Sequence, residues 1–232
     1  MSDSSTRILA IRHGETAWNL DTRIQGHLDI GLNATGRWQA ERLGQAVADE
    51  PLSAVYSSDL ARARDTAQAV ATAAGLTVQV DAGLRERAFG VFQGQTFDEI
   101  TARWPVEGKR WRQRDPDFAP EGGESLVDFY ARCVGTAERL AALHPGQTIA
   151  LVAHGGVMDC FYRAATRLPL QAPRSWLVTN ASINRLLFTG EGFTLIGWAD
   201  NSHLDGAALA RDETSDGVVA HATPAETAGP AA

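Results

Sequence analysis

The sequence has few cysteines, no long apolar run and no excess of positive charge. Only two of its 232 residues, Cys133 and Cys160, are cysteine, and they form no C-x-x-C pair, which argues for free thiols in a reducing compartment. The formal net charge of −7 argues against nucleic acid or an anionic membrane surface as the main partner. No stretch approaches the length of a membrane span, and the amino-terminal residues do not resemble a signal peptide. We therefore expect a cytoplasmic protein that binds neither nucleic acid nor membranes.

Strand-like and helix-like segments alternate across residues 1–205. Apolar runs predict strands at 8–11, 52–58, 76–80, 148–153, 182–188 and 193–199. Apolar residues at helical spacing predict helices at 35–49, 60–74, 125–143 and 156–168, and a Thr96–Glu99 capping box predicts a short one after residue 96. This alternation predicts one α/β domain, a three-layer sandwich with a mainly parallel central sheet flanked by helices. Residues 206–232 lack periodicity, and we expect a disordered tail there.

The first predicted strand ends in an unusual group of side chains. Ile8–Ile11 is apolar and uninterrupted, and Arg12, His13 and Gly14 follow it directly. A guanidinium and an imidazole placed side by side repel one another when both are charged, unless an anion lies between them. The motif therefore predicts an anion at the end of this strand.

A second buried strand ends in the same way. The run "IALVAHGG" places His154 and Gly155 after it, and the carboxyl ends of parallel strands meet at one edge of a sheet, where ligands bind. Arg62, in the first turn of a predicted helix, and Glu86, in a loop rich in glycine and aromatic residues, complete the group. Two histidines and two arginines outnumber one carboxylate, so the missing partner is predicted to be a small dianion such as phosphate.

These motifs occur in an order that resembles a known family. The segments "LAIRHGETAWN", "RIQGHLDIGLNATGRWQA", "VYSSDLARARDTA", "LRERAFGVFQG", "GGES" and "LVAHGGV" are similar to those of the histidine phosphatase superfamily, in its phosphoglycerate-mutase-like branch. The resemblance extends over roughly residues 7–204.

The resemblance implies a role for each residue of the group. It implies that His13 is the nucleophile that forms a phosphohistidine, with its other ring nitrogen held by a backbone carbonyl. It implies that Arg12, Arg62 and His154 clamp the phosphoryl oxygens and that Glu86 is the general acid and base. A second, substrate-binding set would complete the phosphate cradle: Asn19, Gln25, Gly26 and Gly155. No metal or other cofactor is implied.

Other interpretations of single residues stay open. Glu86 stands between Arg85 and Arg87, as in a surface salt bridge, and Asn19 and Gln25 suit ordinary turns. A zinc site from His13, His154 and Glu86 has suitable ligand types, but adjacent arginines would repel the cation. Arg64 competes with Arg62, which matches the family position. Four further positions have a structural alternative: Trp104, Trp111 and Phe118 as a substrate lid or as packing, and His203 as a rim or a loop residue. Glu124 and Ser125 suit a helix start better than chemistry.

Departures from the mutase pattern favour a phosphatase. Mutases of this family carry H-G-N-S where this chain has His154-Gly155-Gly156-Val157, Ser or Thr at the position of Gln25, and Tyr at that of Phe89. Each departure removes a group that would hold a glycerate. We expect hydrolysis of a small phosphorylated metabolite. A mutase that uses 2,3-bisphosphoglycerate is the alternative, and a non-catalytic phospho-ligand module is a third hypothesis, which would predict loss of His13 or Glu86. Self-association as a homodimer stays open.

Overall fold

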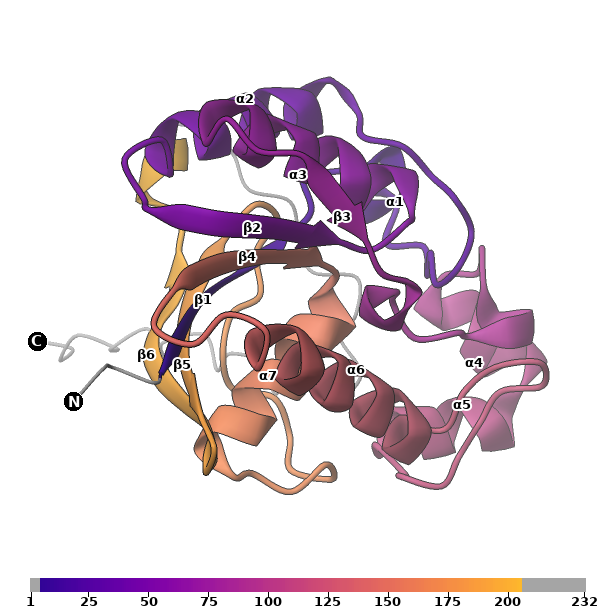
Figure 1. Ribbon diagram of the computed structural model, residues 1–232. Coiled ribbons are helices and arrows are strands. Elements are labelled where there is room, and N and C mark those ends of the chain that lie inside the picture. The colour runs from indigo at the N-terminus through magenta and orange to yellow at the C-terminus, as the bar shows by residue number, and fades with distance from the viewer. Residues whose placement is uncertain (1–4, 206–232) are drawn as a thin grey trace, which may run out of the picture.

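A six-stranded sheet forms the centre of the computed structural model, which describes residues 5–205 (Figure 1). The strand order is β3-β2-β4-β1-β5-β6; the four strands from β3 to β1 pair in parallel, and β5 and β6 are antiparallel. Their bounds are β1 (Thr6–Arg12), β2 (Leu52–Ser57), β3 (Val78–Val80), β4 (Thr148–Ala153), β5 (Ile183–Thr189) and β6 (Gly192–Asp200). The predicted tail at 206–232 lies outside the described residues.

Helices cover both faces of the sheet, which makes the three predicted layers. Alternate side chains of a strand point to opposite faces, so Leu9 and Ile11 of β1 pack toward α2 (Ala34–Ala46) and α3 (Ala61–Ala73). Ile8 and Ala10 pack toward α6 (Leu126–Ala141) and α7 (Gly155–Thr166). The α/β fold class is confirmed.

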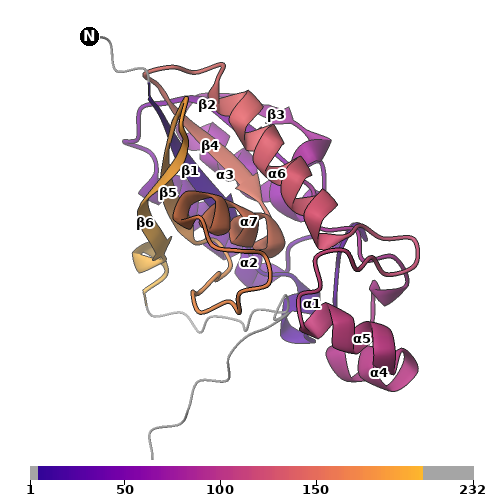
Figure 2. The ribbon, with the colours of Figure 1, turned by 90° about the horizontal axis from the view of Figure 1, so that it is seen from below.

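A third, smaller cluster lies beyond the carboxyl ends of the strands, where Figure 2 shows α4 (Phe97–Arg103) and α5 (Pro105–Arg112) beside α1 (Ala17–Leu20). Thr96 and Glu99 form the predicted capping box of α4. Helices α1 and α5 were not predicted. The cluster contains Ile24, Phe89, Phe92, Ile100, Trp111 and Phe118, with Phe97 and Trp104 packed against it. Trp104, Trp111 and Phe118 therefore pack in an aromatic core of their own.

Three short 3-10 turns complete the fold: η1 (Ala82–Leu84), η2 (Gly90–Phe92) and η3 (Ser202–Leu204). Within residues 5–205, no helix is long and apolar enough to cross a membrane.

Candidate active site

Two neighbouring parallel strands deliver the two histidines of the candidate site. Arg12 at the end of β1 is in register with Ala153 at the end of β4, and the His13 backbone N–H donates to the Ala153 carbonyl over 3.0 Å. The next residues along the two strands are His13 and His154, whose ring centroids lie 5.2 Å apart at an interplanar angle of 62°. The prediction that both histidines reach one sheet edge is confirmed.

The tautomer of His13 is fixed by the backbone. Its Nδ1 lies 2.7 Å from the carbonyl oxygen of Gly14, and a carbonyl only accepts, so Nδ1 carries the proton. Burial lowers the pKa of His13 well below its usual range, and the guanidinium groups of Arg62 and Arg12 lower it further. The ring is therefore neutral at neutral pH and its Nε2 has a lone pair.

His154 is a buried polar ring without a protein partner. Its exposed fraction is 0 %, and neither ring nitrogen makes a hydrogen bond within the described part of the chain. Burial lowers its pKa well below the usual range, with Arg62 as the next cause. A buried polar group normally has a hydrogen-bond partner, so the orphaned ring indicates a place for a ligand. His154 is also the N-cap residue of α7 and gives no side-chain cap, which leaves the backbone N–H of buried Gly155 at the positive end of that helix.

The two arginines are fully enclosed. Arg12 is 0 % and Arg62 is 1 % exposed. Arg12 Nη1 donates to the carbonyl of Val178, while Arg62 donates to the carbonyls of Leu28 over 2.9 Å and Gly26 over 2.8 Å. Backbone carbonyls thus help to orient both guanidinium groups. Arg64 is exposed, which leaves Arg62 as the arginine of the site.

The remaining members of the predicted cradle lie around this group. Asn19 is buried, and its Oδ1 accepts from the backbone N–H of Thr16 over 2.8 Å, so it closes a capping box on α1. Its Nδ2 has no hydrogen-bond partner among residues 5–205. Gln25 is 3 % exposed in the loop that Arg62 anchors. Gly26 has φ +51°, a conformation that favours glycine, and its carbonyl accepts a hydrogen bond from Arg62.

Glu86 is held by two backbone donors. Its Oε1 accepts from the N–H of Arg87 over 2.8 Å and its Oε2 from the N–H of Gly156 over 3.0 Å. The side chain is buried, and the neighbouring Arg85 is engaged with Asp59 over 2.7 Å. The surface salt-bridge interpretation of Glu86 is therefore wrong.

Gly156 makes room for that carboxyl group. A Cβ at position 156 would lie 2.3 Å from Glu86 Oε1 and 3.1 Å from the ring of Phe129. Any side chain here would displace Glu86. The sequence shows only that position 156 lacks a side chain, and the structure shows that the carboxyl group of Glu86 fills the space.

An ion pair fixes the loop that carries Glu86. Arg132 donates to the carbonyls of Gly83, Arg85 and Glu86 over 3.0, 3.0 and 3.1 Å. Glu124 holds Arg132 over 2.7 Å and also accepts from the N–H of Ala88 over 2.9 Å. Ser125 caps α6, as a helix start requires. We expected Glu124 only to begin a helix, but it also stabilises the loop that carries Glu86.

Sequence reasoning missed the segment 178–182. Asn180 Nδ2 donates to the carbonyl of His13 over 3.0 Å, and the backbone N–H of Ala181 donates to the same carbonyl over 3.1 Å. Val178 accepts from Arg12. The segment lies more than 160 residues from the motif it supports, and its buried polar residues before a strand are the only signal it offers. His203 is half-buried beside this segment: burial lowers the pKa of its ring and a hydrogen bond to the backbone of Ala181 opposes that shift, while its own carbonyl accepts from Arg42 over 3.2 Å.

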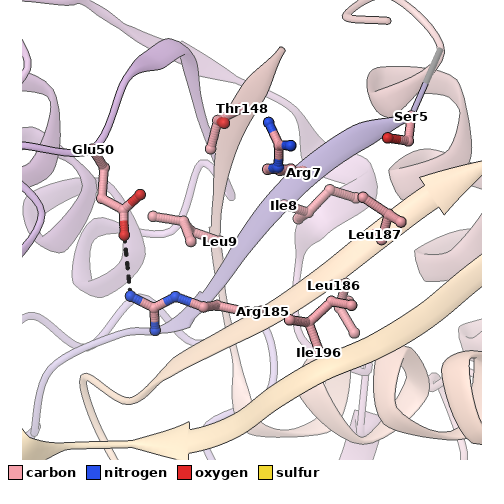
Figure 3. Close-up of a pocket in the computed structure, with 10 residues that line it drawn as sticks. All are labelled: Ser5, Arg7, Ile8, Leu9, Glu50, Thr148, Arg185, Leu186, Leu187 and Ile196. Atoms are coloured by element: carbon pink, nitrogen blue, oxygen red, sulfur yellow. Dashed lines mark hydrogen bonds and ion pairs between the residues drawn. The ribbon is translucent and has the colours of Figure 1, made fainter. Parts of the chain in front are cut away.

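Two pockets differ in their relation to this group. A cavity of about 450 Å³ lies at the opposite, amino ends of β1 and β4, beside the ion pair between Arg185 and Glu50 (Figure 3). A smaller pocket adjoins Glu86 and Gly156. Within residues 5–205, no group of three or more histidine, cysteine or acidic side chains is arranged to hold a metal ion.

Comparisons with known proteins agree with this geometry. The family model of the histidine phosphatase superfamily (branch 1) matches residues 8–201. Phosphoglycerate mutase-like protein 4 of Arabidopsis thaliana is 41% identical over 202 residues, which is 85% of this chain and 86% of the relative. The metal-independent phosphoserine phosphatase of Arabidopsis thaliana is 36% identical over 205 residues, 86% of this chain and 83% of the relative. A solved structure of mycobacterial glucosyl-3-phosphoglycerate phosphatase with VO3 superposes with a TM-score of 0.74 at 35% identity, covering 84% of this chain and 99% of the other.

Proposed function

The chain belongs to the histidine phosphatase superfamily, and from that membership we propose that it hydrolyses small phosphomonoesters through a phosphohistidine on His13. The observation that carries the proposal is the pairing of His13, whose Nδ1–H is held by Gly14, with the unpartnered ring of His154. A tetrahedral phosphoryl group placed between them has a nucleophile on one side and buried donors around it. The relatives named as phosphatases support a hydrolase.

In the first step, Nε2 of His13 attacks the phosphorus atom and the bond to the ester oxygen breaks. Arg12, Arg62, an N–H of neutral His154 and the amino end of α7 stabilise the negative charge on the phosphoryl oxygens. Glu86, in its protonated form, gives its proton to the departing oxygen, so the alcohol leaves neutral.

In the second step, water attacks the phosphohistidine. The Glu86 carboxylate takes a proton from that water, the N–P bond breaks, and phosphate leaves with His13 restored. The backbone donors of Arg87 and Gly156 hold the carboxyl group in one orientation through both steps. Asn19 and Gln25 would close the cradle around the phosphate.

We expect activity without a metal ion. The two arginines supply the charge that a divalent cation supplies in other phosphoryl-transfer enzymes. Treatment with a chelator should leave the rate of phosphate release unchanged, and vanadate should inhibit because it adopts five-coordinate geometry between His13 and the arginines. Loss of turnover on chelation, restored by zinc or magnesium, would contradict this expectation.

The residue at position 156 disfavours the mutase alternative. A mutase must hold its glycerate while it passes the phosphoryl group back, before water intervenes. Gly156, Gln25 and Phe89 stand where mutases carry groups for this purpose, and the space beside Gly156 is filled by Glu86. The binding-module hypothesis is disfavoured because His13 and Glu86 are both present.

The test compares two products from one substrate. With 3-phosphoglycerate, release of inorganic phosphate should exceed formation of 2-phosphoglycerate, with and without added 2,3-bisphosphoglycerate. Both products are measured in the same reaction by phosphorus NMR. Faster isomerisation in the presence of the bisphosphate would replace the phosphatase assignment with the mutase.

We also propose a cytoplasmic location and a small phosphorylated metabolite as the ligand. Cys133 and Cys160 are both free and buried, as suits a reducing compartment. The net charge of −7 disfavours nucleic acid and anionic membranes.

A further inference from the structure

His27 lies in a turn that the phosphate-binding arginine holds, and the proposed mechanism gives it no role. The backbone N–H of Leu28 donates to the carbonyl of Gln25 over 2.9 Å, which closes a tight turn with His27 as its third residue. Arg62 donates to the carbonyls of Gly26 and Leu28 over 2.8 and 2.9 Å. The position of His27 therefore depends on a guanidinium group that we assign to the phosphate.

The ring of His27 reaches the loop that carries the proposed general acid. Its Nε2 lies 2.8 Å from the backbone carbonyl oxygen of Glu86, and because a carbonyl only accepts, Nε2 carries the proton. The same oxygen accepts from Arg132 over 3.1 Å, so both of its lone pairs have a donor. His27 thus joins two segments that are 59 residues apart in the sequence.

The ring of His27 is neutral at neutral pH. Burial lowers its pKa, and the hydrogen bond to the carbonyl of Glu86 opposes that shift. The charged groups near the ring act in both directions: Arg85 and Arg132 lower the pKa, and Glu124 raises it. His27 therefore supplies this loop with an uncharged hydrogen-bond donor.

A glutamine that follows η2 fixes the backbone of the same residue. Gln93 Oε1 accepts from the backbone N–H of His27 over 2.8 Å. A Cβ on Gly26 would lie 2.3 Å from that oxygen, so the glycine makes room for this contact. The turn is thus held by Arg62, by Gln93 and, through the imidazole, by the backbone of Glu86.

We infer that His27 is a positioning residue, whose Nε2–H sets the distance between the phosphate at Arg62 and the carboxyl group of Glu86. The inference rests on the proposed function, in which this carboxyl group gives its proton to the departing oxygen. Such a transfer requires heavy atoms within about 2.6–3.2 Å of one another. The N–H groups of Arg87 and Gly156 orient the carboxyl group, whereas His27 holds the backbone from which it extends.

Three substitutions at position 27 test the inference. His27→Gln and His27→Asn both provide a neutral amide donor and differ in reach. Glutamine places its amide nitrogen about as far along the side chain as Nε2, and asparagine is shorter by one methylene group. His27→Ala removes the donor altogether.

The measured quantity is kcat/KM for an alkyl phosphate, 3-phosphoglycerate, and for p-nitrophenyl phosphate, whose anion departs without a proton. This quantity reports the steps up to departure of the alcohol, so hydrolysis of the phosphohistidine does not enter it. His27→Ala and His27→Asn should each lower the value for 3-phosphoglycerate by roughly 10- to 100-fold, because a misplacement of about 1 Å can cost roughly 10²-fold. The value for p-nitrophenyl phosphate should fall by about threefold or less. His27→Gln should keep both values near native.

Combination with Glu86→Gln shows whether His27 acts through the acid. In that background there is no carboxylic proton to position, so adding His27→Ala should lower kcat/KM for 3-phosphoglycerate by only about threefold or less. His144→Asn is the control, because its ring contacts Tyr56 and Gln147 at the amino ends of the strands. Both substrates should keep their native values in that variant.

The ratio of the two kcat/KM values is taken within one preparation, so a loss of folded protein cancels. An equal loss for both substrates would overturn the inference, as would a native ratio in His27→Asn or no recovery in His27→Gln. Full, independent losses from His27→Ala and Glu86→Gln in the combined variant would do the same. Failure of the proposed function is distinct: the native enzyme would then release no phosphate from either substrate and form no phosphohistidine.

Discussion

His13→Ala should lower the release of phosphate from every phosphomonoester by roughly 10⁴- to 10⁶-fold, the scale seen when a covalent nucleophile is removed. Without Nε2 no covalent intermediate forms, and the arginines can only bind the substrate. Substrate labelled with ³²P should transfer label to the native protein in a rapid quench and none to the variant. The label should be lost in acid and kept in alkali, as a phosphohistidine is.

A second histidine provides the control for this experiment. His144 lies at the opposite end of the sheet, where its ring contacts the hydroxyl of Tyr56 over 2.9 Å and Gln147 over 2.8 Å. His144→Ala should therefore keep the native rate and the native label. Turnover by His13→Ala near the native rate, or label on another residue, would rule out the mechanism.

The edge of the sheet that holds the candidate site could be predicted because it depends on local sequence. Runs of buried β-branched and aliphatic residues define β1 and β4, and parallel strands place their carboxyl ends together. Each run ends in a His-Gly pair, so the meeting of His13 and His154 follows from two short segments alone. The carbonyl that fixes His13 belongs to the next residue, Gly14, which is equally local.

The elements that could not be predicted from the sequence depend on contacts between residues that are far apart along the chain. Helix α5 is rich in charged side chains, and its position is set by Trp111, which packs against Phe92 and Phe89 with ring centroids 5.7 and 5.9 Å apart. Helix α2 ends at Ala46 rather than at the predicted residue 49, and the chain then brings Glu50 to Arg185 of β5 over 3.1 Å. In both cases the residues in contact are not neighbours in the sequence.

The same distinction applies within the site. Asn180 and Val178 support His13 and Arg12 from a segment that carries no recognisable motif. The sequence shows Gly156 only as the absence of a mutase side chain, because the clash that a side chain would make with Glu86 involves residues 70 positions apart. Motifs thus predict which groups do chemistry, and the packing around them shows how those groups are held.

Glu86→Gln should make the rate of phosphoryl transfer depend on how readily the leaving group departs without a proton. Glutamine cannot donate a carboxylic proton, so phosphate release from alkyl phosphates should fall by about 10²- to 10⁴-fold. An aryl phosphate such as p-nitrophenyl phosphate leaves as a stable anion, so formation of the phosphohistidine from it should be much less affected. Its hydrolysis lacks the base, and labelled enzyme should accumulate. An equal loss for alkyl and aryl substrates, without accumulation, would contradict the role of Glu86.

Gly156→Ala offers a second route to the same effect, since it leaves the carboxyl group intact and moves it. The added Cβ would lie 2.3 Å from Glu86 Oε1, and a misplacement of about 1 Å can cost roughly 10²-fold in rate. The loss should again be larger for alkyl than for aryl phosphates, which a general loss of folding would not produce. Gly135→Ala is the matched control, because a Cβ on that exposed face of α6 meets nothing within 4 Å. Native leaving-group dependence in Gly156→Ala would mean that the position of Glu86 does not depend on the space beside Gly156.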